Sequence, residues 1–362
     1  MHIMEAYLNQ PVKTLIENEE KVYKKVMRPN KMSIGIRMIE KIQKNLSKNM
    51  LLYTLIALVF GFIAGYYFQT GVYSELILPV VFIMIYPMMI NMSLSHLKEI
   101  RGSAKPLLTA LIVNFIYAPI IMYFLVKLFV PDTQIALALM FLSIAPASSM
   151  GLGYIGLAEG HILSGTVILT SAFLTSLVVY PIFGAYFANA VNISMPITLL
   201  LKNLLVIIVL PFILGIVTRE YIERKHNAEK YQEVKPYFST VTLLALYVLL
   251  FLIFASKAHL IIQKYIIILM LAPVAIIFYS LTTYLLVHIN KKILKLEYGK
   301  HQAIVFTTVG KNVALTIAIL IAVFGKDGQY MAMAPAIMSL FQAPFLMIYL
   351  KLSHHVRTYF NK

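Results

Sequence analysis

The chain has 362 residues, of which 60% are hydrophobic and only 13% are charged, and its mean hydropathy is +0.81. A soluble globular domain is about half apolar and about a quarter charged, so a water-soluble fold of this size could not bury so much apolar surface. The absence of cysteine excludes disulfides, thiolate–metal sites and cysteine nucleophiles. The composition predicts an integral membrane protein, in which the net charge of +16 reports orientation rather than nucleic-acid binding.

Residues 1–49 are charged and contain Pro11 and Pro29, and they lack the short apolar core and cleavage site of a signal peptide. We interpret this segment as a retained, basic cytoplasmic extension. It is either a solvated tail or, in part, an amphipathic helix on the lipid surface.

Ten apolar runs follow the extension, and a transmembrane helix needs about 20 apolar residues to cross about 30 Å of hydrocarbon. Of the 31 Lys and Arg residues, 25 lie in the termini and in the loops of one side, and four lie in the loops of the other side. This asymmetry predicts ten spans with both termini cytoplasmic. The predicted spans are residues 50–68, 76–93, 106–128, 134–157, 162–187, 197–217, 237–255, 265–289, 302–324 and 330–350.

An odd number of spans in each half forces the second half to insert upside down relative to the first. The sequence therefore predicts an all-α membrane protein built from two inverted five-helix repeats. We place the first repeat at residues 50–188, the second at residues 189–352, and a cytoplasmic tail at residues 353–362.

The fourth span of each half is interrupted at the same depth by small, polar or helix-breaking residues. A proline removes one backbone hydrogen bond, and unwound backbone at membrane depth survives only beside protein or a watery cavity. We predict that helices 4 and 9 are discontinuous and cross at the midplane, at a binding site. The alternative is that these residues form ordinary helix kinks that serve packing and bind no substrate. The residues concerned are Pro146, Ser148, Ser149 and Gly151 in one span and Thr307, Thr308, Gly310, Lys311 and Asn312 in the other.

Lys311 is a cation inside a span, whereas all fifteen acidic residues lie outside the ten runs. Nine residues separate it from the start of span 9, or about 14 Å of helix, which is too deep for the side chain to reach the surface unaided. The ammonium can lose its proton, can be solvated near Ser148, Ser149 and Asn312, or can meet an anionic substrate. The structural alternative is that exposed carbonyls bind it and that it only holds the break together.

Span 5 carries hydroxyl side chains near one helical face, and we name Thr170, Ser171 and Thr175, together with Lys311, as a possible ion or coupling site. Hydroxyls of this kind also serve helix–helix packing. The nine histidines show no paired ligand spacing, and the chain has no Walker loop or GxGxxG fingerprint. We therefore predict no metal site, no cofactor and no enzymatic activity.

Three stretches carry a resemblance to a known superfamily: FIMIYPMMINMSL (82–94), IAPASSMGLGYIGLAEG (144–160) and KNVALTIAILIAVFG (311–325). They resemble spans 2, 4 and 9 of the superfamily that contains the bile acid:sodium symporters and the arsenite efflux carriers, with the arsenite branch the more similar. The resemblance covers about residues 50–352. It implies ten spans, broken helices 4 and 9, and a secondary transporter of the cell membrane.

The departures from that superfamily bear on the cargo. Arsenite carriers place a cysteine directly after the span 4 proline and a glutamate in the span 9 motif, where this chain has Ala147 and Ala314. The sodium-coupled branch uses Glu and Gln where this chain has Thr307 and Lys311. A lysine at a cation site supplies positive charge itself, so the resemblance implies a carrier that does not depend on sodium.

The sequence thus predicts a secondary transporter that moves a small organic anion by alternating access. The substrate would bind at Lys311, Asn312, Ser148, Ser149, Thr307 and Thr308, with helix breaks at Pro146, Gly151 and Gly310. Its partners are the solute and the bilayer, with no nucleic acid, and no oligomeric state is indicated. The alternatives are an atypical arsenite carrier, a sodium-coupled organic anion symporter and, from a different class, a channel or membrane sensor.

Overall fold

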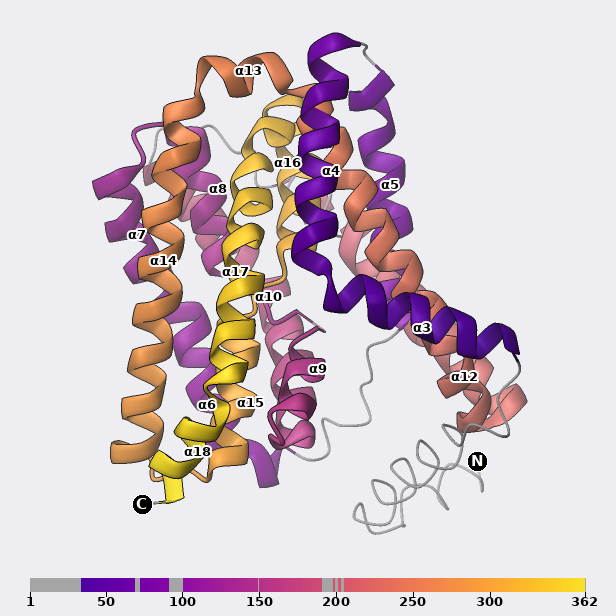
Figure 1. Ribbon diagram of the computed structural model, residues 1–362, viewed down its shortest axis with the longest axis vertical. Helices are drawn as coiled ribbons and strands as arrows, with labels where there is room; N and C mark the ends of the chain where they lie inside the picture. Colours follow the sequence, from indigo (N-terminus) through magenta and orange to yellow (C-terminus); the bar gives the residue numbers. More distant parts are fainter. Residues whose placement is uncertain are drawn as a thin grey trace.

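The computed structural model describes residues 34–68, 72–90, 100–148, 150–190 and 205–361, together with three positions between 198 and 202. Every regular element in these residues is helical (Figure 1). Eight helical segments there are long and apolar enough to cross a membrane. They are Met50–Tyr67, Val72–Ile90, Arg101–Phe129, Ile162–Ala190, Lys230–Ser256, Leu269–Ile293, Val313–Met331 and Met333–Lys351.

These eight segments overlap eight of the ten predicted spans. The predicted span 134–157 is divided into two short helices, so neither part qualifies by length. The predicted span 197–217 begins in residues outside the described ranges. The ten-span count therefore stays a prediction, while the all-helical class is established.

One group of helices consists of α3 (Ile34–Lys48), α4 (Met50–Tyr67), α5 (Val72–Ile90) and α12 (Leu210–Ser256), which pack on one another. The 47 residues of α12 do not form a straight rod. The guanidinium carbon of Arg219 lies 4.4 Å from the ring centre of Tyr231, although twelve residues of straight helix advance about 18 Å. The chain therefore turns back within α12, and its two arms pack beside α4 and α5.

The second group contains the two interrupted helices. Its members are α6 (Ala104–Ile112), a π-helical turn (Val113–Tyr117), α7 (Ala118–Phe129), α8 (Thr133–Ser143), α9 (Met150–Leu157), α10 (Ile162–Ala190), α14 (Tyr265–His288), α15 (Tyr298–Thr308), α16 (Val313–Met331) and α17 (Met333–Lys351). Short π-helical turns also precede α12 (Leu205–Val209) and follow α14 (Ile289–Ile293). The small helices α13 (Ala258–Gln263) and α18 (Ser353–Asn361) lie at opposite ends of the molecule (Figure 1).

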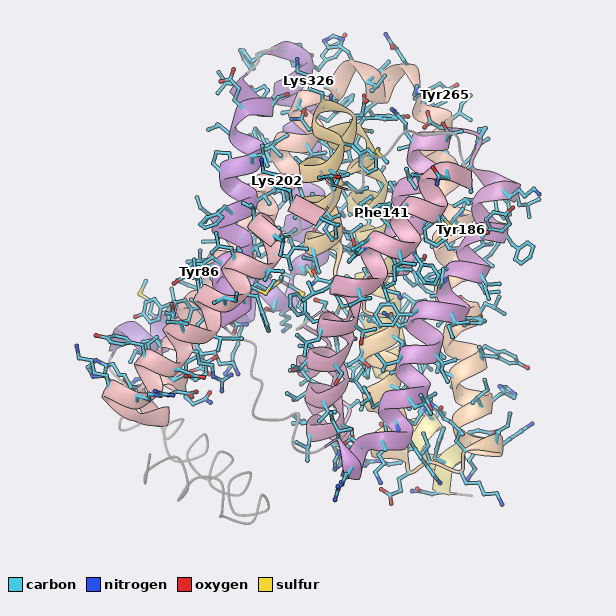
Figure 2. All side chains as sticks on the ribbon, turned by 180° about the vertical axis from the view of Figure 1, so that it is seen from behind. Tyr86, Phe141, Tyr186, Lys202, Tyr265 and Lys326 are labelled. Carbon is cyan, nitrogen blue, oxygen red and sulfur yellow. The ribbon has the colours of Figure 1, made fainter. Side chains whose placement is uncertain are left out.

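The end that carries α13 also carries Tyr265 and Lys326 (Figure 2). Asp132 stabilises this end, because its Oδ1 accepts from the amides of Gln134 and Ile135 and its Oδ2 accepts from Lys264 Nζ at 2.7 Å. Burial opposes ionisation, but these hydrogen bonds hold the pKa of the Asp132 carboxyl below its ordinary value. The carboxylate joins the first turn of α8 to the turn between α13 and α14.

Two glycines of α4 permit its close approach to α12. A Cβ added to Gly61 would overlap the main chain of Phe251, and one added to Gly65 would overlap the carbonyl of Ala255. Small residues at such spacing are typical of membrane helices that pack backbone to backbone.

We predict that Gly65→Leu destabilises the protein by about 1–3 kcal/mol, because the new side chain has to displace α12. The measurement is the thermal unfolding temperature in detergent. Gly153→Leu is the matched control, since a Cβ there meets nothing within 4 Å. Equal unfolding temperatures for the two variants would contradict the packing described here.

Candidate functional site at the crossing of two interrupted helices

Both helices that the sequence predicts to be broken are interrupted. The first ends with α8 at Ser143 and resumes with α9 at Met150, and the second ends with α15 at Thr308 and resumes with α16 at Val313. Pro146 lies in the first interruption and has no amide hydrogen to continue a helix. The chain thus leaves the helical conformation at two points that are far apart in the sequence.

The two interruptions bind each other through their main chains. The amide of Ser148 donates to the carbonyl of Gly310 at 2.8 Å, and the amide of Asn312 donates to the carbonyl of Pro146 at 2.9 Å. Ala147 and Lys311 are therefore paired in an isolated antiparallel bridge. Because unwound backbone in an apolar environment needs partners, this pairing is what makes both interruptions tolerable.

Gln342, on α17, completes the main-chain pairing. Its Oε1 accepts from the amide of Lys311 at 3.0 Å, and its Nε2 donates to the carbonyl of Lys311 at 3.1 Å. Gln342 is not among the site residues predicted from the sequence. The available signal was an amide side chain within the apolar run LFQAPFLM (340–347), since polar groups inside spans are rare and mark functional positions.

The side chains at the crossing lie in two environments. Lys311 Nζ reaches Asn114 Oδ1 and the carbonyl of Ser143. Asn312 Nδ2 instead donates to Met88 Sδ at 3.7 Å, and Ser148 and Asn312 both line a cavity. The predicted site residues are thus divided between two environments.

On the first side, the ammonium of Lys311 is buried in the protein, with the residue 1% exposed. Its Nζ donates to Asn114 Oδ1 and, at 2.6 Å, to the carbonyl of Ser143. Asn114 in turn donates to the carbonyl of Ala145 at 3.0 Å. The sequence suggested solvation near Ser148, whereas the structure gives the amine these acceptors on Asn114 and Ser143.

The amine of Lys311 is bound by uncharged oxygen atoms. Ser143 is the last residue of α8, and the C-terminal end of a helix carries partial negative charge. No ion pair to Lys311 occurs among the described residues. Asn114, which sequence reasoning also missed, lies in the π-helical turn Val113–Tyr117, and such turns are frequent at functional sites.

On the second side lies a narrow cavity between the two groups of helices. Its lining is mainly apolar and, apart from Lys311 at the bridge, contains no charged residue type. The first group contributes Met50, Met88, Thr242, Leu243 and Leu246, and the second contributes Ser148, Met150, Gly151, Tyr154, Gly310, Lys311, Asn312, Val313, Ala314, Ser339, Gln342, Ala343 and Leu346.

Two helices begin at this cavity. Ser148 precedes α9 and its Oγ accepts from the amide of Met150 at 3.4 Å. Asn312 caps α16 and its Oδ1 accepts from the amide of Leu315 at 3.0 Å. Because the N-terminal end of a helix carries partial positive charge, two such ends converging on one cavity favour a negatively charged group there.

Gly151 and Gly310 are also required by the crossing. A Cβ on Gly151 would lie 2.8 Å from the carbonyl of Phe306, so glycine lets the first turn of α9 approach α15. A Cβ on Gly310 would lie 2.5 Å from the same carbonyl. Both glycines line the cavity, as does Ser148.

The remaining predicted residues do not reach this cavity. Thr307 and Thr308 are buried in α15, and their hydroxyls donate to main-chain carbonyls one turn earlier in the same helix. In α10, Thr175 donates to the carbonyl of Ser171, and Thr170 is buried. Their roles in substrate binding or coupling stay predictions. Ser149 lies outside the described residues.

An all-helical protein with many candidate spans, in which two interrupted helices meet beside a cavity, has the architecture of a membrane carrier. Comparison with known protein families also indicates a membrane transporter. The model of the sodium bile acid symporter family matches residues 78–264, and the chain belongs to this family. It is therefore a multi-pass membrane protein of a transporter family, as the resemblance predicted.

The relatives of this chain include two arsenical-resistance proteins. The Acr3 protein of Corynebacterium glutamicum is 24% identical over 73% of this chain and 74% of its own length. The Acr3 protein of Alkaliphilus metalliredigens is 22% identical over 80% of this chain and 84% of its own length. An uncharacterized transporter of Synechocystis is 25% identical over 78% of both chains.

We predict that Asn114→Leu destabilises the protein by about 3 kcal/mol, because it leaves a buried ammonium with one fewer acceptor. In the double variant Asn114→Leu/Lys311→Met, most of this loss should be recovered, since no charge then needs an acceptor. Thermal unfolding of the wild type, both single variants and the double variant gives the cycle. Additive losses would show that Lys311 and Asn114 are not coupled.

Proposed function

We propose that this protein is a secondary transporter that carries a small organic anion across the cell membrane by alternating access. The observation that supports this most directly is the convergence of α9 and α16, by their N-terminal ends, on one cavity between two groups of helices. Helix ends of this kind bind anions, and a cavity between two packed groups can change the side from which it is reached when one group moves against the other.

The proposed topology has ten spans in two inverted five-helix repeats, residues 50–188 and 189–352, flanked by the extension 1–49 and the tail 353–362. Helices α8 and α9 form the fourth span, α15 and α16 form the ninth, and the bridge lies at the midplane. The opposite placement of α13 and α18 supports cytoplasmic termini (Figure 1), because α13 lies in a segment poor in basic residues and α18 in a segment rich in them.

The conformation fits a carrier whose cavity is reached from the cytoplasm. At the end of the molecule that carries α13, Gln329 Nε2 donates to the carbonyl of Ser74 at 3.2 Å and joins α16 to α5. Met50 begins α4, and Leu346 lies in the last two turns of α17, so the cavity they line is displaced from that contact toward the end with α18.

The lining favours an anion with an apolar body. Three methionines, Met50, Met88 and Met150, supply flexible apolar contacts. Hydrogen-bonding groups are concentrated at the crossing, where Ser148 and Asn312 lie. A carboxylate would therefore bind near the helix ends, with its hydrocarbon part among the methionines.

The ammonium of Lys311 supports independence from sodium. When protonated, it places a positive charge at the crossing, where carbonyl oxygens accept its hydrogens. A carrier with this charge built in does not need to recruit a metal cation to the same oxygens. Coupling through the Lys311 proton, or through Thr170, Ser171 and Thr175 on α10, belongs to the same proposal.

We predict saturable uptake and counterflow of radiolabelled aliphatic monocarboxylates in proteoliposomes, at rates that agree within about twofold in sodium, potassium and choline buffers. Lys311→Met should lower the flux at least tenfold, because the charge at the crossing is lost. Lys326→Met, at the exposed end of α16, is the control. A strict sodium requirement that survives Lys311→Ala would overturn the proposal.

The names of two relatives support one further candidate, an atypical metalloid efflux carrier. Ala147 stands directly after the proline, and the chain has no thiol. Expression in arsenite-sensitive cells separates the candidates, because a metalloid carrier raises tolerance to arsenite and an organic anion carrier does not. Diffusive conductance without counterflow would indicate a channel.

A further inference from the structure

Helix α3 does not follow the axis of the helix it precedes. Only Asn49 separates it from α4, and α3 then runs crosswise at the start of α4 (Figure 1). The candidate span begins at Met50, immediately after this bend. A bilayer that surrounds α4 therefore has one of its surfaces at the level of α3.

One face of α3 is basic. Arg37, Lys41, Lys44 and Lys48 are spaced by four, three and four residues, which places them in one row along the helix, and all four are exposed. The helix contains a single carboxylate, Glu40, which pairs with Lys44 at 2.6 Å. The row therefore carries a clear excess of positive charge.

An exposed apolar strip lies beside the basic row. Met38 and Ile42 each follow one of the basic residues by one position, and they are 63% and 39% exposed. Leu46, one turn beyond Ile42 along the same row, is buried against the protein, and its carbonyl accepts from the hydroxyl of Tyr247 on α12 at 2.9 Å. A helix that offers an apolar strip and a basic row side by side is suited to the interface between acyl chains and phosphate headgroups.

We propose that α3 binds the anionic phospholipids of the bilayer and that this binding regulates access to the cavity. The basic row contacts the phosphate groups, and Met38 and Ile42 enter the upper acyl region. Basic residues near an anionic surface are attracted to it electrostatically. The preference is therefore for anionic over zwitterionic headgroups.

Contacts connect α3 to the cavity. Asn45 Nδ2 donates to the hydroxyl of Tyr53 on α4 at 2.8 Å, and the rings of Tyr53 and Tyr247 are 5.7 Å apart. Met50 and Leu246, which adjoin this cluster in the chain, line the cavity. A shift of α3 on the lipid surface is thereby transmitted to α4 and α12 at the cavity wall.

The chain contains neither tryptophan nor cysteine, so a single introduced probe reports alone. Met38→Trp in nanodiscs tests the contact by fluorescence quenching with brominated phosphatidylglycerol or, at the same mole fraction, brominated phosphatidylcholine. We expect at least twofold stronger quenching by the anionic lipid, and we expect Lys41→Gln/Lys44→Gln/Lys48→Gln to remove the difference. Phe60→Trp, 61% exposed on α4, is the control and should be quenched equally by both lipids.

Equal quenching of Met38→Trp by the two lipids would overturn headgroup recognition, and no quenching by either would place α3 away from the bilayer. Raising the salt concentration from 0.1 to 0.5 M should weaken the preference for the anionic lipid, because salt screens charge. This tests the electrostatic contribution to lipid binding without the triple substitution. None of these measurements requires a transported solute. Their outcome for lipid binding is therefore independent of whether the proposed transport is correct.

A separate probe tests whether lipid binding by α3 regulates access to the cavity. The rate at which a water-soluble maleimide modifies Met50→Cys reports access to the cavity. We expect this rate to differ at least twofold between discs with and without phosphatidylglycerol, and the difference to disappear in the triple variant. An identical rate in both discs would overturn regulation by lipid.

Discussion

The structure depends on main-chain hydrogen bonds between two stretches of chain that are not helical. Ending α8 and α15 inside an apolar bundle leaves amides and carbonyls without helical partners, and in such surroundings each unpaired group is costly. Ser148, Gly310, Pro146 and Asn312 satisfy one another, and Gln342 takes both main-chain groups of Lys311. Neither interruption would be tolerable alone, so the two breaks form a single structural unit.

The same unit separates charge. Two helices, α9 and α16, begin at the cavity, and the positive ends of their dipoles face it. On the other side of the bridge, α8 ends at Ser143, whose carbonyl accepts from the Lys311 ammonium. The helix ends therefore give partial positive charge to the cavity side of the bridge and partial negative charge to the side where the Lys311 amine lies. This arrangement accounts for a buried lysine that has no carboxylate partner among the described residues.

Much of this could be predicted from the sequence, because its signals are local. Pro146 and Gly310 mark the interruptions, and the apolar runs predict the helical class. The direction of the Lys311 side chain could not be predicted, because it depends on pairing between residues 147 and 311. Asn114 is 197 residues from Lys311 in the chain, and no spacing rule connects positions so distant. The hydroxyls of Thr307 and Thr308 are ambiguous in sequence, since hydroxyls bind their own helix as readily as a ligand.

The pairing of Ala147 with Lys311 shows how one fold can carry different chemistry at its crossing. The hydrogen bonds of the bridge run between the flanking residues, so Ala147 and Lys311 form a non-hydrogen-bonded pair, the arrangement in which opposite side chains approach most closely. A methyl group at position 147 leaves the stem of the lysine free to pass toward Asn114. A larger or reactive side chain there would compete for the same space. The two positions therefore constrain each other, and the residue type at each sets which charge the crossing holds, while the main-chain pairing that forms the crossing needs neither side chain.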